Sequence, residues 1–213
     1  MAQDFDKLVA DWPPEARAQL VALKTPLQIQ AFLDATPYST EPVYRSPLSV
    51  LRDRRAHCFD GALLAAAALR AQGEAPLIVD MRAENDDDHI LTIFKRGGCF
   101  GAVAKSNTTV LRFREPVYRN LRELVMSYFD LYYNLNGDKA LREYSVPIDL
   151  RQYDRIDWMS RDAGLDAIAE RLDTIHHHAL LTPAMIATLS KVDPKLYAAG
   201  LMGADEAGLY KPT

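Results

Sequence analysis

The chain has 213 residues, of which 48% are hydrophobic and 25% are charged, as is usual for a soluble globular protein. Its formal net charge of −4 gives no electrostatic attraction to nucleic acid or to an anionic membrane, so neither is expected as a partner. No apolar run reaches the ~18 residues of a membrane span, and the acidic N-terminal stretch predicts no secretory signal. Two cysteines are too few for a disulfide framework, and we expect a cytoplasmic protein.

Prolines and a threonine mark the first predicted helices. Pro13 and Pro14 open one that runs through "EARAQLVALK", and Thr25 before Pro26 predicts the N-cap and first turn of the next. Three prolines in "TPYSTEPVYRSP" then predict a loop. A short helix or an extended segment is expected over 48–54.

The middle of the chain carries the clearest signals. Residues 58–71 are rich in alanine and leucine and end before Gly73, which predicts a helix that is apolar on all sides and therefore buried. Aliphatic residues predict a strand over 77–83. Two further strands, 89–95 and 99–105, are predicted to form a hairpin around Gly97-Gly98. A buried helix packed on an antiparallel sheet is an α+β fold.

The last third of the chain predicts helices. We expect them over 115–137, where aromatic residues have helical spacing, and over 158–175 and 182–192.

No linker interrupts the sequence, so we predict a single domain over residues 1–213. Its catalytic core covers about 45–110, with helical decoration over 1–37 and 115–213.

Cys58 stands at the start of the predicted buried helix. Unpaired N–H groups at a helix N-terminus stabilise a thiolate, and the Cys58 N–H could donate to an oxyanion. A packing role for a small buried cysteine is the alternative. A nucleophilic cysteine needs a base, and His89 opens the first hairpin strand. Counting back from the turn sets His89 opposite Ser106 and beside Asn107, with a register uncertain by about one residue.

The stretches "RAHCFDGALLAAAALRAQGEAPLIVDMRA" and "DDDHILTIFKRGGCFGAVAKSN" resemble the transglutaminase-like superfamily of papain-type cysteine enzymes, and more broadly the chain resembles bacterial transglutaminase-like proteins. In that family a cysteine begins a buried helix, a histidine begins a strand, and an acid or amide follows on the next strand. The resemblance covers roughly residues 45–110 and implies Cys58 as nucleophile, His89 as general base and Asn107 as the orienting residue.

The sequence departs from the family pattern at two places. Asn107 stands where the family usually has an aspartate, and Ile90 follows the histidine where a tryptophan is common. Asp88 is a second candidate for the charge, although its side chain should point away from its neighbour's ring. His57 is a secondary candidate that points away from Cys58. We still expect cysteine-dependent activity despite these departures, but they argue against protein crosslinking.

Two further motifs contain residue types that are common in binding sites. Three consecutive histidines at 176–178 do not share a helix face and have no partner at a ligand-like spacing, so we predict no metal site. The acidic run 86–88 could bind a cation or an amine, but such a run between strands is more often a solvated turn. No cofactor is predicted.

The sequence therefore predicts cysteine-dependent acyl transfer at an amide bond of a small molecule or peptide. Water is always present and nothing in the sequence marks an amine-acceptor site, so we expect hydrolysis rather than transfer to an amine. The alternative is a transglutaminase-like fold that has lost its catalytic triad and acts as a binding or scaffold module. Rapid alkylation of Cys58 with a lowered thiol pKa would support the first interpretation.

Overall fold

The computed structural model describes residues 2–211, and it describes side chains from Phe5 onward. In this part of the chain a seven-stranded sheet has the order β4-β3-β2-β1-β5-β7, with β6 pairing with β1, and every pairing is antiparallel. The strands are β1 (Leu77–Ala83), β2 (His89–Arg96), β3 (Cys99–Val103), β4 (Arg114–Tyr118), β5 (Leu141–Ser145), β6 (Ile148–Asp149) and β7 (His177–Ala179).

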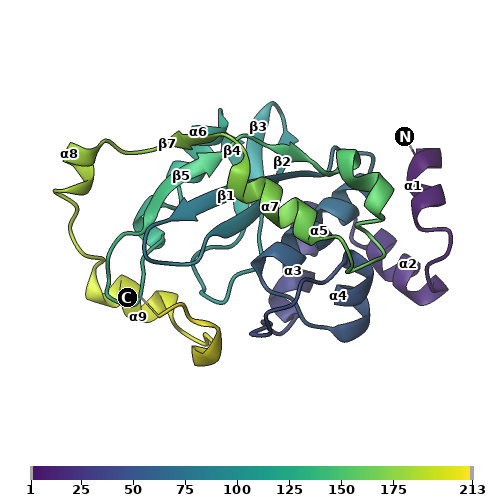
Figure 1. The fold of residues 1–213 in the computed structure, drawn as a ribbon, viewed down its shortest axis with the longest axis horizontal. Coiled ribbons are helices and arrows are strands. Elements are labelled where there is room, and N and C mark those ends of the chain that lie inside the picture. The colour runs from purple at the N-terminus through teal and green to yellow at the C-terminus, as the bar shows by residue number, and fades with distance from the viewer. Residues whose placement is uncertain (1, 212–213) are drawn as a thin grey trace.

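Helices surround this sheet. Those before β1 gather at one side of the molecule, whereas α8 and α9 lie at the opposite end (Figure 1). The helices are α1 (Ala2–Leu8), α2 (Pro14–Ala22), α3 (Pro26–Ala35), α4 (Pro47–Asp53), α5 (Cys58–Ala71), α6 (Leu121–Met126), α7 (Asp166–Thr174), α8 (Pro183–Ile186) and α9 (Pro194–Gly200). Short 3-10 helices are η1 (Phe129–Leu131), η2 (Leu150–Ile156) and η3 (Glu206–Gly208). None of the described helices is long and apolar enough to cross a membrane.

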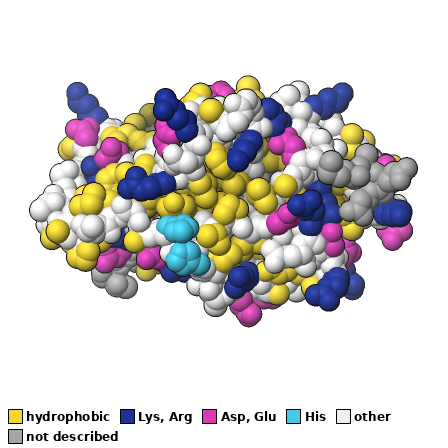
Figure 2. All heavy atoms as spheres, turned by 90° about the horizontal axis from the view of Figure 1, so that it is seen from above, with side chains coloured by type: hydrophobic (Ala, Val, Ile, Leu, Met, Phe, Trp, Pro, Cys, Tyr) yellow, Lys and Arg dark blue, Asp and Glu magenta, His cyan; other side chains and the backbone are white. Residues whose placement is uncertain are grey.

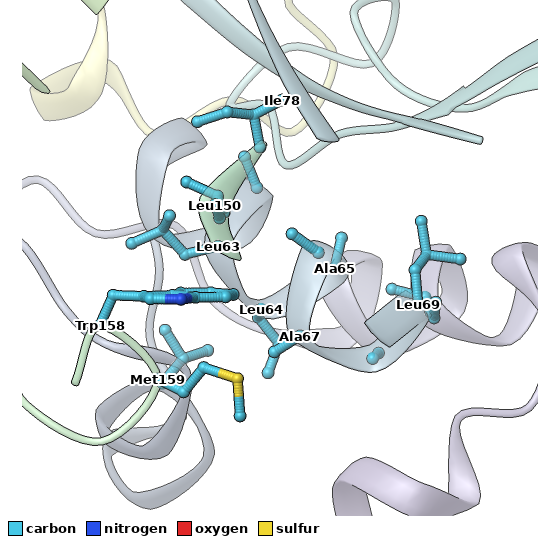
Figure 3. Close-up of a cluster of buried hydrophobic side chains, with 14 of the residues drawn as sticks. Leu63, Leu64, Ala65, Ala67, Leu69, Ile78, Leu150, Trp158 and Met159 are labelled. Atoms are coloured by element: carbon cyan, nitrogen blue, oxygen red, sulfur yellow. The ribbon is translucent and has the colours of Figure 1, made fainter. Parts of the chain in front are cut away.

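The helix α5 forms the centre of the larger hydrophobic core. All its residues from Phe59 to Arg70 are buried, which confirms the prediction of an enclosed helix. Figure 3 shows Leu63 and Leu64 with Trp158 and Met159 in this core. Burying one leucine side chain contributes about 1.5–3 kcal/mol, so this helix supplies a large part of the folding free energy. The predicted α+β class is confirmed.

The hairpin register is also as predicted. Arg96 pairs with Cys99 across a two-residue turn. Gly97 and Gly98 have φ values of 58° and 83°, the left-handed conformation that a type I′ turn requires at both positions. The second strand ends at Val103 and not at the predicted residue 105, and the chain leaves the sheet at this point.

The prediction of long helices after residue 115 is wrong in three places. Residues 114–118 form β4, with alternate side chains exposed, and Asn120 then caps the short α6. The predicted helix over 158–175 begins only at α7, because Asp157 and Gly164 have positive φ values and hold turns. The last predicted helix is limited to the single turn α8. Aromatic spacing in this region reflects packing on the sheet, since Tyr128 and Tyr132 are buried there.

Gly61 lets α5 approach the chain after β3. A Cβ atom at this position would lie 2.3 Å from Lys105 Cβ, which is closer than real Cβ atoms come. We expect Gly61→Ala to lower the free energy of unfolding by about 1–3 kcal/mol, because backbone must shift to relieve the overlap. Helix propensity alone predicts the opposite sign, a gain of about 1 kcal/mol. Urea denaturation of the two proteins decides between them, and a stabilised variant would contradict the packing argument.

Candidate functional site

A cavity of about 440 Å³ lies where the N-terminus of α5 meets the start of β2. Its walls come from segments that are far apart in the sequence, including the loop before α4, the acidic turn before β2, and the chain after β3. Residues near the C-terminus complete it, among them Leu201, Gly208, Leu209 and Tyr210. Every residue predicted for the site lines this cavity: His57, Cys58, Asp88, His89, Ser106 and Asn107.

Cys58 is the first residue of α5, as the sequence predicts. The helix end is capped by His57, whose Nδ1 accepts from the Phe59 N–H at 3.2 Å, while its Nε2 contacts the Val43 carbonyl at 3.2 Å. A carbonyl can only accept, so the proton lies on Nε2 and the ring is neutral. Burial also lowers the pKa of His57 to about 4. His57 therefore caps the helix and is not positioned as a base.

Asp60 completes the cap. Its carboxylate is fully buried and accepts from the Arg45 N–H at 2.8 Å and from the His57 N–H at 3.2 Å. Arg45 Nη1 lies 3.8 Å from the same carboxylate. Burial nevertheless raises the pKa of Asp60 to about 7, because these contacts only partly replace water. Asp60 therefore serves as part of the N-terminal cap of α5.

The Cys58 thiol is directed at the start of β2. Its Sγ lies 3.8 Å from the Asp88 carbonyl oxygen, to which the thiol can donate. Burial raises the pKa of the Cys58 thiol to about 12, although the N–H groups of Ile90 and Phe59 stabilise the thiolate and act in the opposite direction. The expectation of a lowered thiol pKa is therefore wrong. Desolvation outweighs the helix N-terminus at this position.

His89 is buried, with an exposed fraction of 5%. Its Nε2 lies 2.9 Å from the Leu111 carbonyl oxygen, which must accept, so Nε2 carries the proton and Nδ1 keeps its lone pair. The ring also meets Tyr132 edge to face, with ring centroids 6.4 Å apart. Burial lowers the pKa of His89 to about 4, so the imidazole is neutral and retains a basic nitrogen at neutral pH.

Cys58 and His89 approach the cavity from different sides of the sheet. Along β2, Ile90 and Phe94 pack in the core around α5, whereas Leu91 and Ile93 pack on the other face. Side chains alternate along a strand, so His89 belongs to the face opposite α5. Accordingly, no hydrogen bond joins the two side chains in the described part of the chain. Both side chains line the cavity, which lies at the start of β2.

The predicted hydrogen bond from Asn107 to His89 is wrong. The Asn107 amide bonds the main chain of Asp205 in both directions, with Nδ2 donating at 2.8 Å and Oδ1 accepting at 2.9 Å. The cause is the early end of β3 at Val103, which removes residue 107 from the sheet. The His89 imidazole bonds to the Leu111 carbonyl instead.

The two other secondary candidates also bond elsewhere. Ser106 accepts from the Thr108 N–H at 3.0 Å in a local turn. The Asp88 carboxylate accepts from the Ala83 N–H at 2.7 Å, so it turns away from its neighbour His89 as the alternation of strand side chains predicts. In the part of the chain that the structure describes, neither side chain hydrogen-bonds to the imidazole.

Sequence reasoning missed a buried pair on the α5 face of the sheet. Asp80 lies on β1 and is 1% exposed, and its Oδ2 is 2.9 Å from His177 Nε2. His177 Nδ1 contacts the Ile175 carbonyl at 2.8 Å. Two features of the sequence pointed to these residues. Asp80 is an aspartate inside a mostly apolar strand, and His177 is one of three consecutive histidines. Their pairing depends on β7, which was not predicted.

The other members of the histidine triplet face outward. His176 and His178 are exposed, and their rings meet edge to face at 4.6 Å. No group of three or more His, Cys, Asp or Glu side chains is arranged to hold a metal ion among the described residues.

Comparisons with known proteins give only distant similarities. No protein-family model matches the sequence, and the search of curated proteins finds no relative. Among solved structures, Legionella pneumophila LapG matches with 18% identity over 49% of this chain and 72% of LapG, at a TM-score of 0.35. Its EGTA-treated form matches with 15% identity over 80% of this chain and 97% of LapG, at 0.40. Both TM-scores are below 0.5, and similarities this distant assign no function to the chain.

The Asn107 contacts predict a role in holding the C-terminal wall of the cavity. Asn107→Ala removes both hydrogen bonds to Asp205, so we expect amide exchange over 205–210 to become at least tenfold faster. Hydrogen–deuterium exchange read by mass spectrometry measures this. Ser106→Ala is the matched control and should leave these amides unchanged. Equal exchange in wild type and Asn107→Ala would refute the anchoring role.

The lowered pKa of His89 predicts acid sensitivity. Between about pH 6.5 and pH 4 the unfolded chain binds a proton at this residue that the folded chain does not, so stability falls as the solution is acidified. His89→Gln lacks this linkage and keeps a donor for Leu111. The stability of wild type relative to the variant should therefore fall by ~1 kcal/mol per pH unit in this window. Denaturant titrations at several pH values test the slope, and a pH-independent difference would contradict it.

Proposed function

We propose that the protein is a cysteine-dependent enzyme that cleaves an amide bond by acyl transfer to water, with Cys58 as the nucleophile. The observation that carries this proposal is the position of Cys58 at the first residue of a buried helix that opens into a cavity. Its backbone N–H has no partner in the described part of the chain, because His57 caps the next N–H instead. That free donor is suited to an oxyanion.

The electrostatics of the site favour base-assisted attack over a stored thiolate. Burial keeps both the Cys58 thiol and the His89 imidazole neutral. His89 Nδ1 retains its lone pair, since Nε2–H donates to the Leu111 carbonyl. In the proposed reaction this nitrogen takes the thiol proton as the substrate carbonyl binds. Because the two side chains line the same cavity from different faces of the sheet, the proton transfer in this proposal runs through one water bound in the cavity.

The reaction proceeds in two stages. Sγ forms a bond to the amide carbonyl carbon, the thiol proton passes to His89, and the carbonyl oxygen becomes an oxyanion near the Cys58 N–H. The C–N bond then breaks, and His89 returns the proton to the departing amine. Water, deprotonated by His89, attacks the thioester and releases a carboxylic acid and the free thiol.

A binding or scaffold module is the second candidate function. The raised pKa of the Cys58 thiol and the missing hydrogen bond to His89 support it. In that case the cavity binds a ligand without covalent chemistry.

The dependence of Cys58 reactivity on His89 separates these two functions. If His89 acts as a base toward the thiol, iodoacetamide should alkylate Cys58 at pH 7 at least tenfold faster in wild type than in His89→Gln. Peptide mass spectrometry after timed quenching gives the rate at Cys58, and Cys99 in the same molecule is the internal reference. Circular dichroism checks the variant's fold. Equal Cys58 rates in the two proteins would favour the scaffold module.

A further inference from the structure

We propose that the cavity binds an amide substrate through a cationic nitrogen group, a guanidinium or an ammonium, that donates to the free oxygen of Asp80. This proposal names the substrate class for the function proposed above and rests on it only for the cleavage step. Binding of the cation itself depends on the walls of the cavity and not on the reactivity of Cys58.

The lining of the cavity has charge of one sign. None of its lining residues is a lysine or an arginine, whereas six are acidic: Glu41, Asp80, Asp86, Asp87, Asp88 and Asp173. Glu41 is already paired with Arg45 and Arg55. The other five have no ion pair with a lysine or arginine in the described part of the chain. By contrast, positive and negative side chains are interspersed on the face of the molecule shown in Figure 2. The cavity therefore attracts cations.

Asp80 supplies the acceptor inside this cavity. Among the described residues, its Oδ1 is the one buried side-chain nitrogen or oxygen atom without a hydrogen-bond partner. A buried acceptor without a partner is unfavourable, and a ligand N–H can satisfy it. Asp80 pairs directly with Ile90 across the two strands, and Ile90 is the residue whose N–H faces the Cys58 sulfur. A group bound at Asp80 thus lies on the same face of the sheet as the nucleophile.

The partner of Asp80 lets this oxygen respond to a cation. His177 Nδ1 must carry a proton because it faces the Ile175 carbonyl, and a second proton must lie between Nε2 and Asp80 Oδ2. The pair is neutral overall, either as two neutral groups or as a carboxylate and an imidazolium. A cation at Oδ1 favours the carboxylate form, since it stabilises the negative charge.

The acidic turn before β2 adds negative charge at the same opening. Its shape is fixed, because the Asp86 carboxylate accepts from the Asp87 N–H at 2.9 Å and the Tyr132 hydroxyl donates to the Asp87 carbonyl. Burial raises the pKa of Asp86 to about 7, with repulsion from Asp87 and Asp88 adding to it. A bound cation relieves that repulsion and so stabilises the turn with its three carboxyl groups close together.

Isothermal titration calorimetry with the Cys58→Ala protein tests this proposal without turnover. The probes are N-acetyl-arginine methylamide and its neutral isostere N-acetyl-citrulline methylamide, which differ only in the side-chain charge and its donor group. We expect the arginine probe to bind at least tenfold more tightly than the citrulline probe. Asp80→Asn and, separately, Asp87→Asn should each reduce that preference to threefold or less.

The variants and outcomes separate the alternatives. Glu115→Gln removes one exposed negative charge on β4, outside the cavity, and should leave both affinities unchanged. Asp87 is exposed in a turn, so its variant remains informative if Asp80→Asn fails to fold. Equal affinities for the two probes, or binding of neither, overturn the proposal. Binding of calcium chloride without binding of the arginine probe would assign the carboxylates to a metal ion and overturn it as well. Failed alkylation of Cys58 would leave this binding result intact.

Discussion

The burial of the N-terminus of α5 is the constraint on which the site depends. A helix end leaves backbone N–H groups without partners, and away from water each of them must be satisfied by the protein. Here His57 and the fully buried Asp60 supply the partners, and Asp60 ties the cap to the loop at Arg45. This network uses the N–H of Phe59 and leaves that of Cys58 free. The same cap that stabilises the helix thus determines where the thiol and the unused donor stand.

Burial of the site also determines the protonation states of its side chains. Removing the thiol and the imidazole from water destabilises their charged forms, so Cys58 and His89 are both held neutral. A helix N-terminus is worth typically 0.3–1 kcal/mol to a charge, whereas full desolvation shifts a pKa by several units. Position at a helix start is therefore not sufficient to activate a cysteine, because desolvation of the thiol opposes the effect of the helix.

The elements that carry the nucleophile could be predicted because their signals are local. The alanine-rich run gives α5, and Gly97-Gly98 gives the hairpin turn. Contacts to His89 could not be predicted, because its partner is the Leu111 carbonyl, and a backbone oxygen carries no signal of residue type. The Asp80–His177 pair joins positions 97 residues apart through β7, a three-residue strand that exists only because it pairs with β5. Long-range pairing of this kind leaves little trace in a single sequence.

The three units nearest the proposed chemistry are Cys58, His89 and the Asp80–His177 pair, and each of them carries no net charge before a ligand arrives. Cys58 keeps its proton, His89 lacks a second one, and Asp80 shares one with His177. A buried site arranged in this way avoids the several kcal/mol that each isolated buried ion would cost the fold. A net charge then develops only when a ligand brings a compensating charge or a reacting carbonyl into the cavity. The stability of the folded chain and the reactivity of the site need not oppose each other, since a net charge arises only in the complex.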